Sequence, residues 1–368
     1  MRSGRKFAAT GRRRSQYGRG PAPGTKPEPS FAGYGNYQPE LEKWLTDNDF
    51  FQNIWRKTSV FLDKVKLDWN IQLGSFDQRN PFIQDVAATL QHIFVKKILN
   101  KLEELVEMTG CRNLYFTGGS ALNIVANSAI ISSDIFKNVF IPPCTEDSGL
   151  ALGAAAFMEW KKHGKIEIHS PYLNNWAIED YTCKYSMETI KTISKNLVQK
   201  KIIGICNGFG EAGPRALGNR SIIALADSKT LSKKLSMEVK GREWYRPLAP
   251  IALEKNTKYF TGMEIIHPLS KYMLLDFKVL PDKQKEIAGA IHVDGTARFQ
   301  TIFKRRENPF MFDLLLYLDE NYNIKALINT SFNAKGKPIV HTNTDALNTA
   351  KKINLDSVVI NGKYIESM

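Results

Sequence analysis

Segments typical of helices and of strands alternate along most of this chain, and this alternation constrains its fold more than any other feature. Residues 81–108 place apolar side chains at helical spacing, and NLYFTGGSALNIVANSAI is typical of a strand, a glycine turn and a helix. In the second half, SMETIKTISKNLVQKKIIGICNG and MFDLLLYLDENYNIKALINTSFN each indicate a helix followed by a strand. Alternation in both halves predicts an α/β protein.

Three further segments carry structural signals. FAGYGNYQPELEKWLTDNDFF predicts a glycine turn and then an amphipathic helix, with Leu41, Trp44 and Leu45 on one face. Residues 54–73 alternate apolar and polar side chains enough to suggest strands. NVFIPPCTEDSGLALGAAAFMEW indicates a short strand, a loop and a small-residue helix from about Ser148.

Length and composition indicate a protein of two domains. The 368 residues leave room for both, and the polar stretch 163–174 marks a boundary between them. No apolar run approaches the roughly 20 residues that span a bilayer, and no apolar segment follows the basic N-terminus as in a secretory signal. The four cysteines lack metal-site or disulfide spacing. We therefore expect a reduced, cytoplasmic protein that does not enter a membrane.

The positive charge is concentrated at the N-terminus. Residues 1–30 carry eight lysines and arginines but only one acidic residue, so half of the net charge of +14 lies there. This Gly/Pro/Arg/Ser-rich tail has too little apolar surface to build a core. Nucleic-acid binding is one interpretation of such a tail, but we expect a disordered basic extension and no nucleic-acid partner.

The stretch 204–250 predicts an anion-binding site. It reads GICNGFGEAGPRALGNRSIIALADS and ends, after a variable run, in KGREWYRPLAP. Two later clusters, DGTARFQ at 294–300 and NTSFNAKGKPIV at 329–340, have the same character. Arginine offers a bidentate fork, and glycine lets backbone N–H groups approach anionic oxygens. The alternative is a set of surface salt bridges.

Two smaller motifs each have two interpretations. TGGSALN follows a predicted strand, so its amides suit a nucleotide phosphate, although a tight turn with positive φ explains the glycines equally well. Glu146 and Asp147 begin a predicted helix and suit a divalent cation, whereas helix capping by Asp147, Ser148 or Thr145 is the alternative.

Taken together and in order, the motifs resemble one enzyme family. They are GGSALN, PxxxEDSGLALGAA, GxxEAGPRALGNRSI, KxREWYRPLAP, HVDGTARFQTI and LINTSFNAKGKPIV. They closely resemble the O-carbamoyltransferases of the nodulation-protein and antibiotic-tailoring type, such as the cephem and tobramycin carbamoyltransferases. The resemblance covers roughly Phe31 to Ala346.

The resemblance implies a fold and a reaction. After the tail 1–30, residues 31–168 are expected to form the C-terminal portion of an actin/hexokinase-like ATPase domain. Residues 169–368 are expected to form a YrdC-like α/β domain that joins carbamoyl phosphate to ATP as carbamoyl-adenylate. The first domain would then pass the carbamoyl group to a hydroxyl of a small-molecule acceptor, beside a divalent iron, manganese or magnesium ion.

The resemblance also implies roles for individual residues. The positions expected to act in catalysis are Arg215, Lys240, Arg246 and Arg298. Those expected to bind carbamoyl phosphate and ATP are the same four with Asn219, Arg220, Ser221, Arg242, Asn329, Ser331 and Asn333. The nucleotide-phosphate turn comprises Gly118, Gly119, Ser120 and Asn123, and Asp147 matches the metal ligand.

The chain departs from the family in the transfer half. The family's ATPase-like domain begins with a subdomain and a closely spaced histidine pair, and none of the six histidines here forms such a pair. We therefore expect an incomplete metal site, completed by a separate chain or a homo-oligomer, and exposed apolar surface around residues 31–75. Two alternatives are a transfer-incompetent homologue that binds nucleotide or carbamoyl phosphate, and an enzyme related to RNA modification.

Overall fold

The computed structural model describes residues 31–48, 50–52, 60–61, 63, 79–166, 170–178 and 180–366. The predicted tail 1–30 lies outside the described residues, as does most of the segment 54–73 that was expected to form strands. Within that segment the described residues Val60, Phe61 and Asp63 are helical, so the strand prediction is wrong at those positions.

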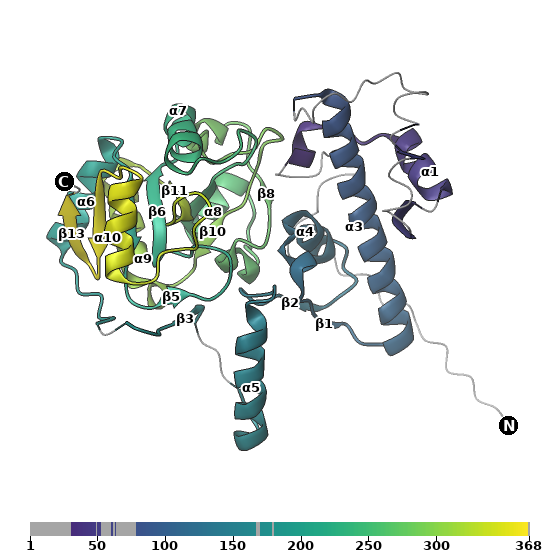
Figure 1. Cartoon of the computed structure of the whole chain (residues 1–368), viewed down its shortest axis with the longest axis horizontal. Helices are drawn as coiled ribbons and strands as arrows, with labels where there is room; N and C mark the ends of the chain where they lie inside the picture. Colours follow the sequence, from purple (N-terminus) through teal and green to yellow (C-terminus); the bar gives the residue numbers. More distant parts are fainter. Residues whose placement is uncertain are drawn as a thin grey trace.

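The N-terminal region, residues 31–166, is mostly helical (Figure 1). Its elements are the 3₁₀ turn η1 (Phe31–Tyr34), α1 (Pro39–Asp47), η2 (Phe50–Gln52), α3 (Pro81–Thr109), β1 (Asn113–Tyr115), η3 (Gly119–Leu122), α4 (Ile124–Ser132), β2 (Asn138–Phe140) and α5 (Gly149–His163). Strands β1 and β2 pair in parallel. The predicted helices at 41–45, 81–108 and from about 148, and the strand, glycine turn and helix after Cys111, are confirmed.

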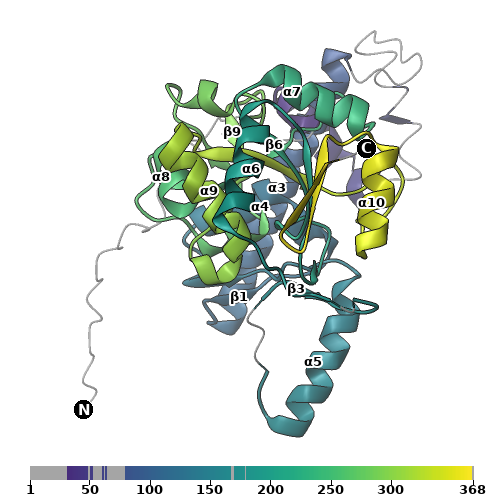
Figure 2. The same cartoon turned by 90° about the vertical axis from the view of Figure 1, so that its left-hand side faces the viewer.

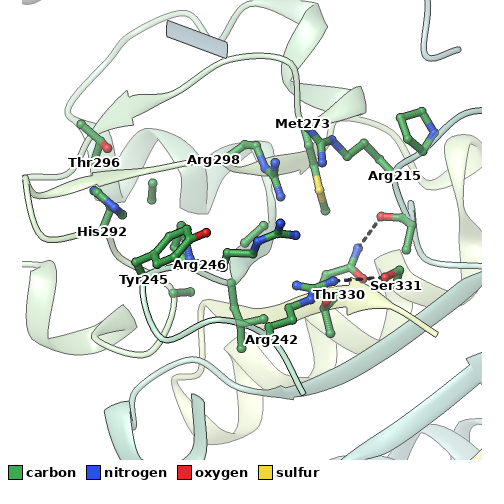
Figure 3. A pocket seen from close by; sticks show the side chains of 18 of the residues that line it. Arg215, Arg242, Tyr245, Arg246, Met273, His292, Thr296, Arg298, Thr330 and Ser331 are labelled. Carbon is green, nitrogen blue, oxygen red and sulfur yellow. Dashed lines mark hydrogen bonds between the residues drawn. The ribbon is translucent and has the colours of Figure 1, made fainter. Parts of the chain in front are cut away.

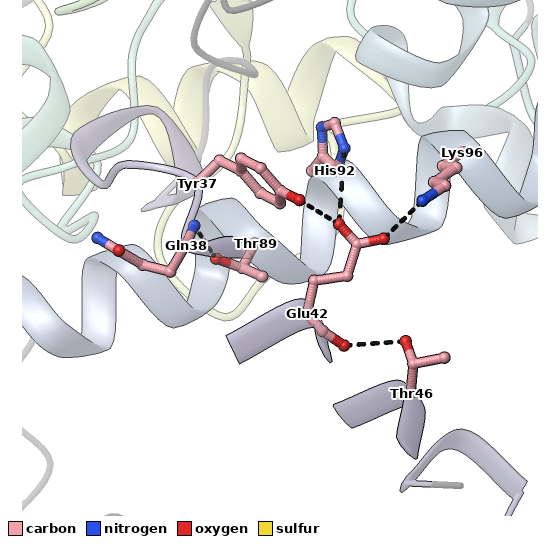
Figure 4. Close-up of polar contacts among 7 residues, drawn as sticks. All are labelled: Tyr37, Gln38, Glu42, Thr46, Thr89, His92 and Lys96. Atoms are coloured by element: carbon pink, nitrogen blue, oxygen red, sulfur yellow. Dashed lines mark hydrogen bonds and ion pairs between the residues drawn. The ribbon is translucent and has the colours of Figure 1, made fainter. Parts of the chain in front are cut away.

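An apolar contact and a polar cluster join α1 to α3. Leu41 and Leu45 are buried against Ile93, as the amphipathic pattern predicts. Beside them, the Glu42 carboxylate accepts hydrogen bonds from the Tyr37 hydroxyl and, at 2.8 Å, from Lys96 Nζ (Figure 4). These bonds fix how the segment from η1 to α1 lies along α3.

The C-terminal region contains a seven-stranded mixed sheet in the order β10-β7-β11-β6-β4-β12-β13. Its strands are β4 (Ile203–Cys206), β6 (Arg220–Leu225), β7 (Ala249–Leu253), β10 (Gln300–Ile302), β11 (Ala326–Ser331), β12 (Ser357–Ile360) and β13 (Lys363–Glu366). Its helices are α6 (Met187–Val198), α7 (Lys229–Lys233), α8 (Glu254–Thr261), α9 (Pro309–Tyr322) and α10 (Asn343–Lys352), with shorter turns η4 (Lys234–Val239), η5 (Pro268–Tyr272), η6 (Gln284–Ile287) and η7 (Arg305–Glu307). Pairs β8 (Phe277–Lys278) with β9 (Thr296–Ala297), and β3 (Tyr172–Asn174) with β5 (Gly210–Glu211), form two small antiparallel sheets.

The core lies on both faces of this sheet. Every residue of β4, β6 and β7 is buried, as expected of central strands covered on both sides. Helices α6 and α9 lie on one side of the sheet, and α10 lies on the other (Figure 2). The predicted fold class, α/β with a YrdC-like unit after part of an ATPase-like unit, is confirmed in its α/β architecture.

Hydrogen bonds connect the two regions. Asn127 Nδ2, in α4, donates to the carbonyl oxygen of Leu274 at 3.0 Å, and Asp276 N donates to Ser128 Oγ at 3.1 Å. The boundary at residues 168 and 169 stays a prediction. Within the described part of the chain, no helix combines the length and apolar character needed to cross a membrane.

Candidate functional site

A cavity of about 450 Å³ opens beside the ends of three elements of the C-terminal region. Its volume lies within the roughly 300–1,000 Å³ typical of ligand pockets. The lining residues come from the loops 214–216 and 242–248, from β7, from residues 290–298 around β9, from the end of β11 and from Phe31. Tyr245, His292 and Thr296 lie toward one end, Arg215 and Met273 lie toward the other, and Arg242, Arg246 and Arg298 lie between them (Figure 3).

The loop that carries Arg215 is held by a close approach and a buried carboxylate. Gly213 has a φ of 103°, and a Cβ there would lie 2.3 Å from the Pro143 carbonyl oxygen, so only glycine fits. Oε1 of buried Glu211 accepts bonds from Leu217 N at 2.7 Å and Asn219 N at 2.8 Å. Sequence reasoning missed Glu211, although it stands inside the GxxEAGPR motif.

The cavity gathers four of the predicted arginines, Arg215, Arg242, Arg246 and Arg298. Burial and then the charge of Arg242 lower the pKa of Arg215. Burial, followed by the charges of Arg298 and Arg246, lowers the pKa of Arg242 to about 10. Burial and repulsion between neighbouring guanidinium groups together produce both shifts.

Few negative charges balance these cations. Among the described residues that line the cavity there is no aspartate or glutamate. Glu243 Oε2 lies 2.9 Å from Arg246 Nε, but this pair is largely exposed and Glu243 does not line the cavity. Arg215 Nε is buried without a hydrogen-bond partner among the described residues. The cavity is therefore electrostatically suited to an anion.

Lys240 stands behind the cavity wall and holds the loop after β11. Its Nζ donates to the carbonyl oxygens of Ser331 and Asn333, at 2.5 and 2.8 Å, and to Asn333 Oδ1. Ser331 Oγ also lies 3.3 Å from both Lys240 Nζ and Arg242 Nη2. Burial and the charge of Arg242 lower the pKa of Lys240 to about 7. Ser331 lines the cavity and Lys240 does not, so Ser331 lies between Lys240 and the space that a ligand would occupy.

Three predicted residues instead bind the protein's own backbone. Buried Arg220 donates to the carbonyl oxygens of Asn207, Gly208, Asn219 and His341 at 2.8–3.0 Å. Asn219 Nδ2 donates to the Phe209 carbonyl oxygen at 2.9 Å, and Ser221 Oγ accepts from Gly218 N at 2.9 Å. None of the three lines the cavity. Their contacts hold the arginine loop in place.

Asn329 lines the floor of the cavity. Its Nδ2 donates to the Ala216 carbonyl oxygen at 3.1 Å and to Gln300 Oε1 at 2.5 Å. Its Oδ1 is buried and has no hydrogen-bond partner among the described residues. An amide oxygen in that position suits a ligand N–H donor. The other predicted asparagine, Asn333, is held by Lys240 and does not line the cavity.

The predicted nucleotide turn and metal ligand lie away from this cavity. Gly118 has a φ of 94° and donates its N–H to the Thr145 carbonyl oxygen at 2.7 Å, as the tight-turn interpretation requires. Neither Gly119 nor Ser120 lines the cavity, and Asn123 Oδ1 caps α4 by accepting from Ala126 N. The phosphate role of this turn stays a prediction.

Asp147 is exposed before α5, and the described residues contain no cluster of three or more His, Cys, Asp or Glu side chains suited to a metal. The capping alternative is not confirmed for Ser148, which occupies the N-cap position of α5 but makes no side-chain capping bond; its N–H donates to Glu146 at 2.7 Å. His92 is exposed beside Tyr37 and Glu42. These residues alone do not form a metal site, and the metal role of Asp147 stays a prediction.

Phe31, Tyr245 and His292, which the sequence patterns did not single out, line the cavity, and Tyr34 and Trp244 pack against them. The rings of Phe31 and Tyr245 lie 5.2 Å apart, and Tyr34 contacts the rings of Trp244 at 4.9 Å and His292 at 5.5 Å. All five belong to the motifs FAGYG, KxREWYRPLAP and HVDGTARFQTI. Their motif membership was visible, but their convergence on one cavity depends on the tertiary fold.

Family models match most of the chain. The model described as Carbamoyltransferase N-terminus matches residues 63–156, and the model described as Carbamoyltransferase C-terminus matches residues 194–367. The cavity, except for Phe31, lies within the second match.

Curated proteins are similar over longer stretches. An uncharacterised protein of Methanocaldococcus jannaschii is 32% identical over 332 residues, which is 84% of this chain and 60% of that protein. The nodulation protein NolO of Bradyrhizobium diazoefficiens is 32% identical over 325 residues, 82% of this chain and 58% of its own length. The chain thus spans about 60% of the length of these relatives. Full-length HypF, solved in a phosphate- and nucleotide-bound form, is a distant match with 20% identity and a TM-score of 0.34, covering 48% of this chain and 21% of HypF.

Proposed function

This chain belongs to the carbamoyltransferase family, and from that premise we propose that its arginine-lined cavity binds carbamoyl phosphate and ATP and joins them as carbamoyl-adenylate. The carbamoyl group then passes to a hydroxyl of a small-molecule acceptor. The observation that carries the proposal is the convergence of Arg215, Arg242, Arg246 and Arg298 on a cavity whose described lining includes no carboxylate.

Carbamoyl phosphate matches the chemistry of this cavity. It is a compact dianion with a planar amide, so its capture needs several fixed cations and a hydrogen-bond acceptor for the amide N–H. The four guanidinium groups supply the cations, and Asn329 Oδ1 supplies a buried acceptor with no partner among the described residues. The triphosphate of ATP uses the same cations, because Arg forks suit phosphate oxygens.

These donors also favour the chemical step. Water first displaces phosphate from carbamoyl phosphate and leaves carbamate. When a carbamate oxygen then attacks the α-phosphorus of ATP, negative charge spreads over the phosphoryl oxygens and pyrophosphate leaves. Arginines already held in place by Glu211, Gly213 and the β11 loop stabilise that charge without rearranging. The proposed site therefore has two sets of residues. One set is the cations that face the ligands, and the other is the buried residues, including Arg220 and Lys240, that fix the positions of those cations.

The test of the proposed function is an assay of the purified chain with ATP and carbamoyl phosphate. We expect phosphate and pyrophosphate to be released only when both substrates are present, and mass spectrometry should detect carbamoyl-adenylate. If both ligands bind in calorimetry but no pyrophosphate appears, the chain is the transfer-incompetent binding homologue. If neither ligand binds to folded protein, the proposed function is wrong.

A further inference from the structure

His292 is a buried imidazole in the cavity wall with unused hydrogen-bonding capacity. It is 6% exposed and lines the cavity beside Tyr245 and Thr296 (Figure 3). Neither ring nitrogen meets the geometry of a hydrogen bond among the described residues, and only Nδ1 has a nearby charged partner, Asp294. Buried polar side-chain atoms are nearly always paired, so the unpaired Nε2 of a ring that lines a cavity indicates a contact made by a ligand or water.

A buried carboxylate stands behind the ring. Asp294 Oδ1 lies 3.4 Å from His292 Nδ1 and accepts hydrogen bonds from Thr296 N at 2.9 Å and Thr296 Oγ1 at 2.7 Å. Burial alone would raise the pKa of Asp294, but the interactions with His292 and Thr296 outweigh it, and the pKa is lowered. Asp294 is therefore ionised at neutral pH, and a carboxylate in this position stabilises an imidazolium and orients the ring.

The N-terminal region also packs against the imidazole. A Cβ on Gly33 would lie 2.3 Å from His292 Cε1, so the glycine backbone packs directly against the ring. The Tyr34 ring meets it edge to face, with centroids 5.5 Å apart and planes at 83°. Asp294, Gly33 and Tyr34 together restrict how the ring can turn.

His292 differs chemically from the rest of the cavity. The other charged side chains that line it are the four arginines, and the described lining includes no aspartate or glutamate. A guanidinium donates hydrogen bonds but has no acceptor atom for a proton taken from water. An imidazole has a ring nitrogen that accepts a proton, so His292 is the described lining group best suited to act as a general base.

We propose that His292 is the general base for the conversion of carbamoyl phosphate to carbamate in this cavity. Water attacks the carbamoyl carbon, one water proton passes to His292, and the C–O bond to the phosphate breaks. The second water proton leaves with the phosphate as hydrogen phosphate, and the carbamate anion remains to attack ATP. Asp294 and Gly33 are positioning residues for the base. This inference rests on the proposed function, and it assigns a residue to its first step.

The test compares phosphate release by the full chain and by His292→Gln. We expect the variant to lose about 100-fold or more of the carbamoyl phosphate-dependent rate, the usual contribution of a general base, while calorimetric affinities for carbamoyl phosphate and ATP change less than about twofold.

Two further variants separate catalysis from folding. His267→Asn is the matched control, because His267 is also buried, does not line the cavity, and uses Nδ1 to accept from Leu269 N, which an asparagine oxygen can replace. We expect it to keep the wild-type rate. Gly33→Ala keeps the imidazole but displaces it, and we expect a lower kcat with little change in KM.

The possible failures are distinguishable. Wild-type protein that binds both ligands and releases no phosphate would overturn the proposed function together with this inference. Wild-type phosphate release that His292→Gln retains at an undiminished rate would overturn the role of His292 alone. If His292→Gln does not fold, a normal kcat in Gly33→Ala would overturn the inference.

Discussion

The two regions of the molecule differ in how completely they bury their apolar surface. In the C-terminal region all residues of the central strands β4, β6 and β7 are buried. In the N-terminal region none of the 15 residues of α5 is buried, and Leu150 and Trp160 are 73% and 52% exposed. Figures 1 and 2 show α5 standing away from the rest of the chain. Tyr115 and Phe140, on the paired strands β1 and β2, are also exposed.

The ligand cavity is therefore supported by residues of this chain, whereas the N-terminal surface leaves apolar side chains exposed. The cavity lies on a well-packed core, so residues of this chain hold its arginines in place. A two-stranded sheet and an apolar helix in water are poorly stable, and exposed apolar patches mark surfaces that other protein covers. The sequence predicted such a surface around residues 31–75, much of which lies outside the described residues, and this stays a prediction. In the described part of the chain, exposed apolar side chains also lie on α5 and β1–β2.

Core truncation should reveal the largest contrast between the regions. Ile223 lies in the centre of β6 and is fully buried, so Ile223→Ala should lower the free energy of unfolding by about 2–5 kcal/mol. Leu150→Ala removes a similar side chain from α5 and should change it by less than about 0.5 kcal/mol. Urea denaturation monitored by circular dichroism measures both. Equal effects would mean that α5 is packed in solution.

Removing one buried cation should have the next largest effect. Arg215→Ala deletes a guanidinium from the cavity and should weaken carbamoyl phosphate binding by roughly 10- to 150-fold, corresponding to about 1.5–3 kcal/mol. Arg246→Ala should cost less, because Arg246 is already paired with Glu243. Arg305→Ala, a surface residue paired with Asp313, is the control and should bind normally. Calorimetry that finds Arg215→Ala and Arg305→Ala alike would remove Arg215 from the site.

Anion affinity should depend on pH through Lys240. Its pKa of about 7 in the free protein should rise when an anion binds nearby, so the protonated form binds more tightly. Affinity for carbamoyl phosphate should therefore be greatest below pH 7 and fall by up to about tenfold per unit as pH rises through that value. Lys240→Met should bind more weakly and lose this dependence. Binding titrations with carbamoyl phosphate from pH 6 to pH 9 distinguish a Lys240 that loses its proton in this range from one that stays charged.

The smallest expected effect concerns the exposed surface itself. At tens of micromolar the isolated chain should associate with itself through α5, because apolar side chains such as Phe157 and Trp160 have no cover in the described structure. The double variant Phe157→Ser and Trp160→Ser should lower the association severalfold, while Lys161→Ser on the same helix should not. Light scattering across a concentration series provides the readout. A monomer at every concentration would show that this surface does not mediate self-association.

Part of the fold and of the candidate site was predictable from the local sequence. The helices at 39–47 and 81–109 follow apolar spacing that needs no knowledge of the rest of the chain. Arg215 and Arg220, in contrast, stand in one motif and look equivalent. The structure turns Arg215 into the cavity and commits Arg220 to backbone carbonyls, including that of His341. Arg215 and Arg220 differ in their burial and in their partners from distant parts of the chain, and residue spacing predicts neither property.

The sequence by itself determined the α/β class, the family and the arginine-bearing motifs, because these depend on residue type and order along the chain. Which cations share a cavity, and that Gly33 of η1 packs against His292 beside Asp294, became visible only in the tertiary structure. The physical reason is that hydrophobic burial and hydrogen bonding act through space. They join side chains from opposite ends of the chain, and they set the charge balance of a site that no single motif contains.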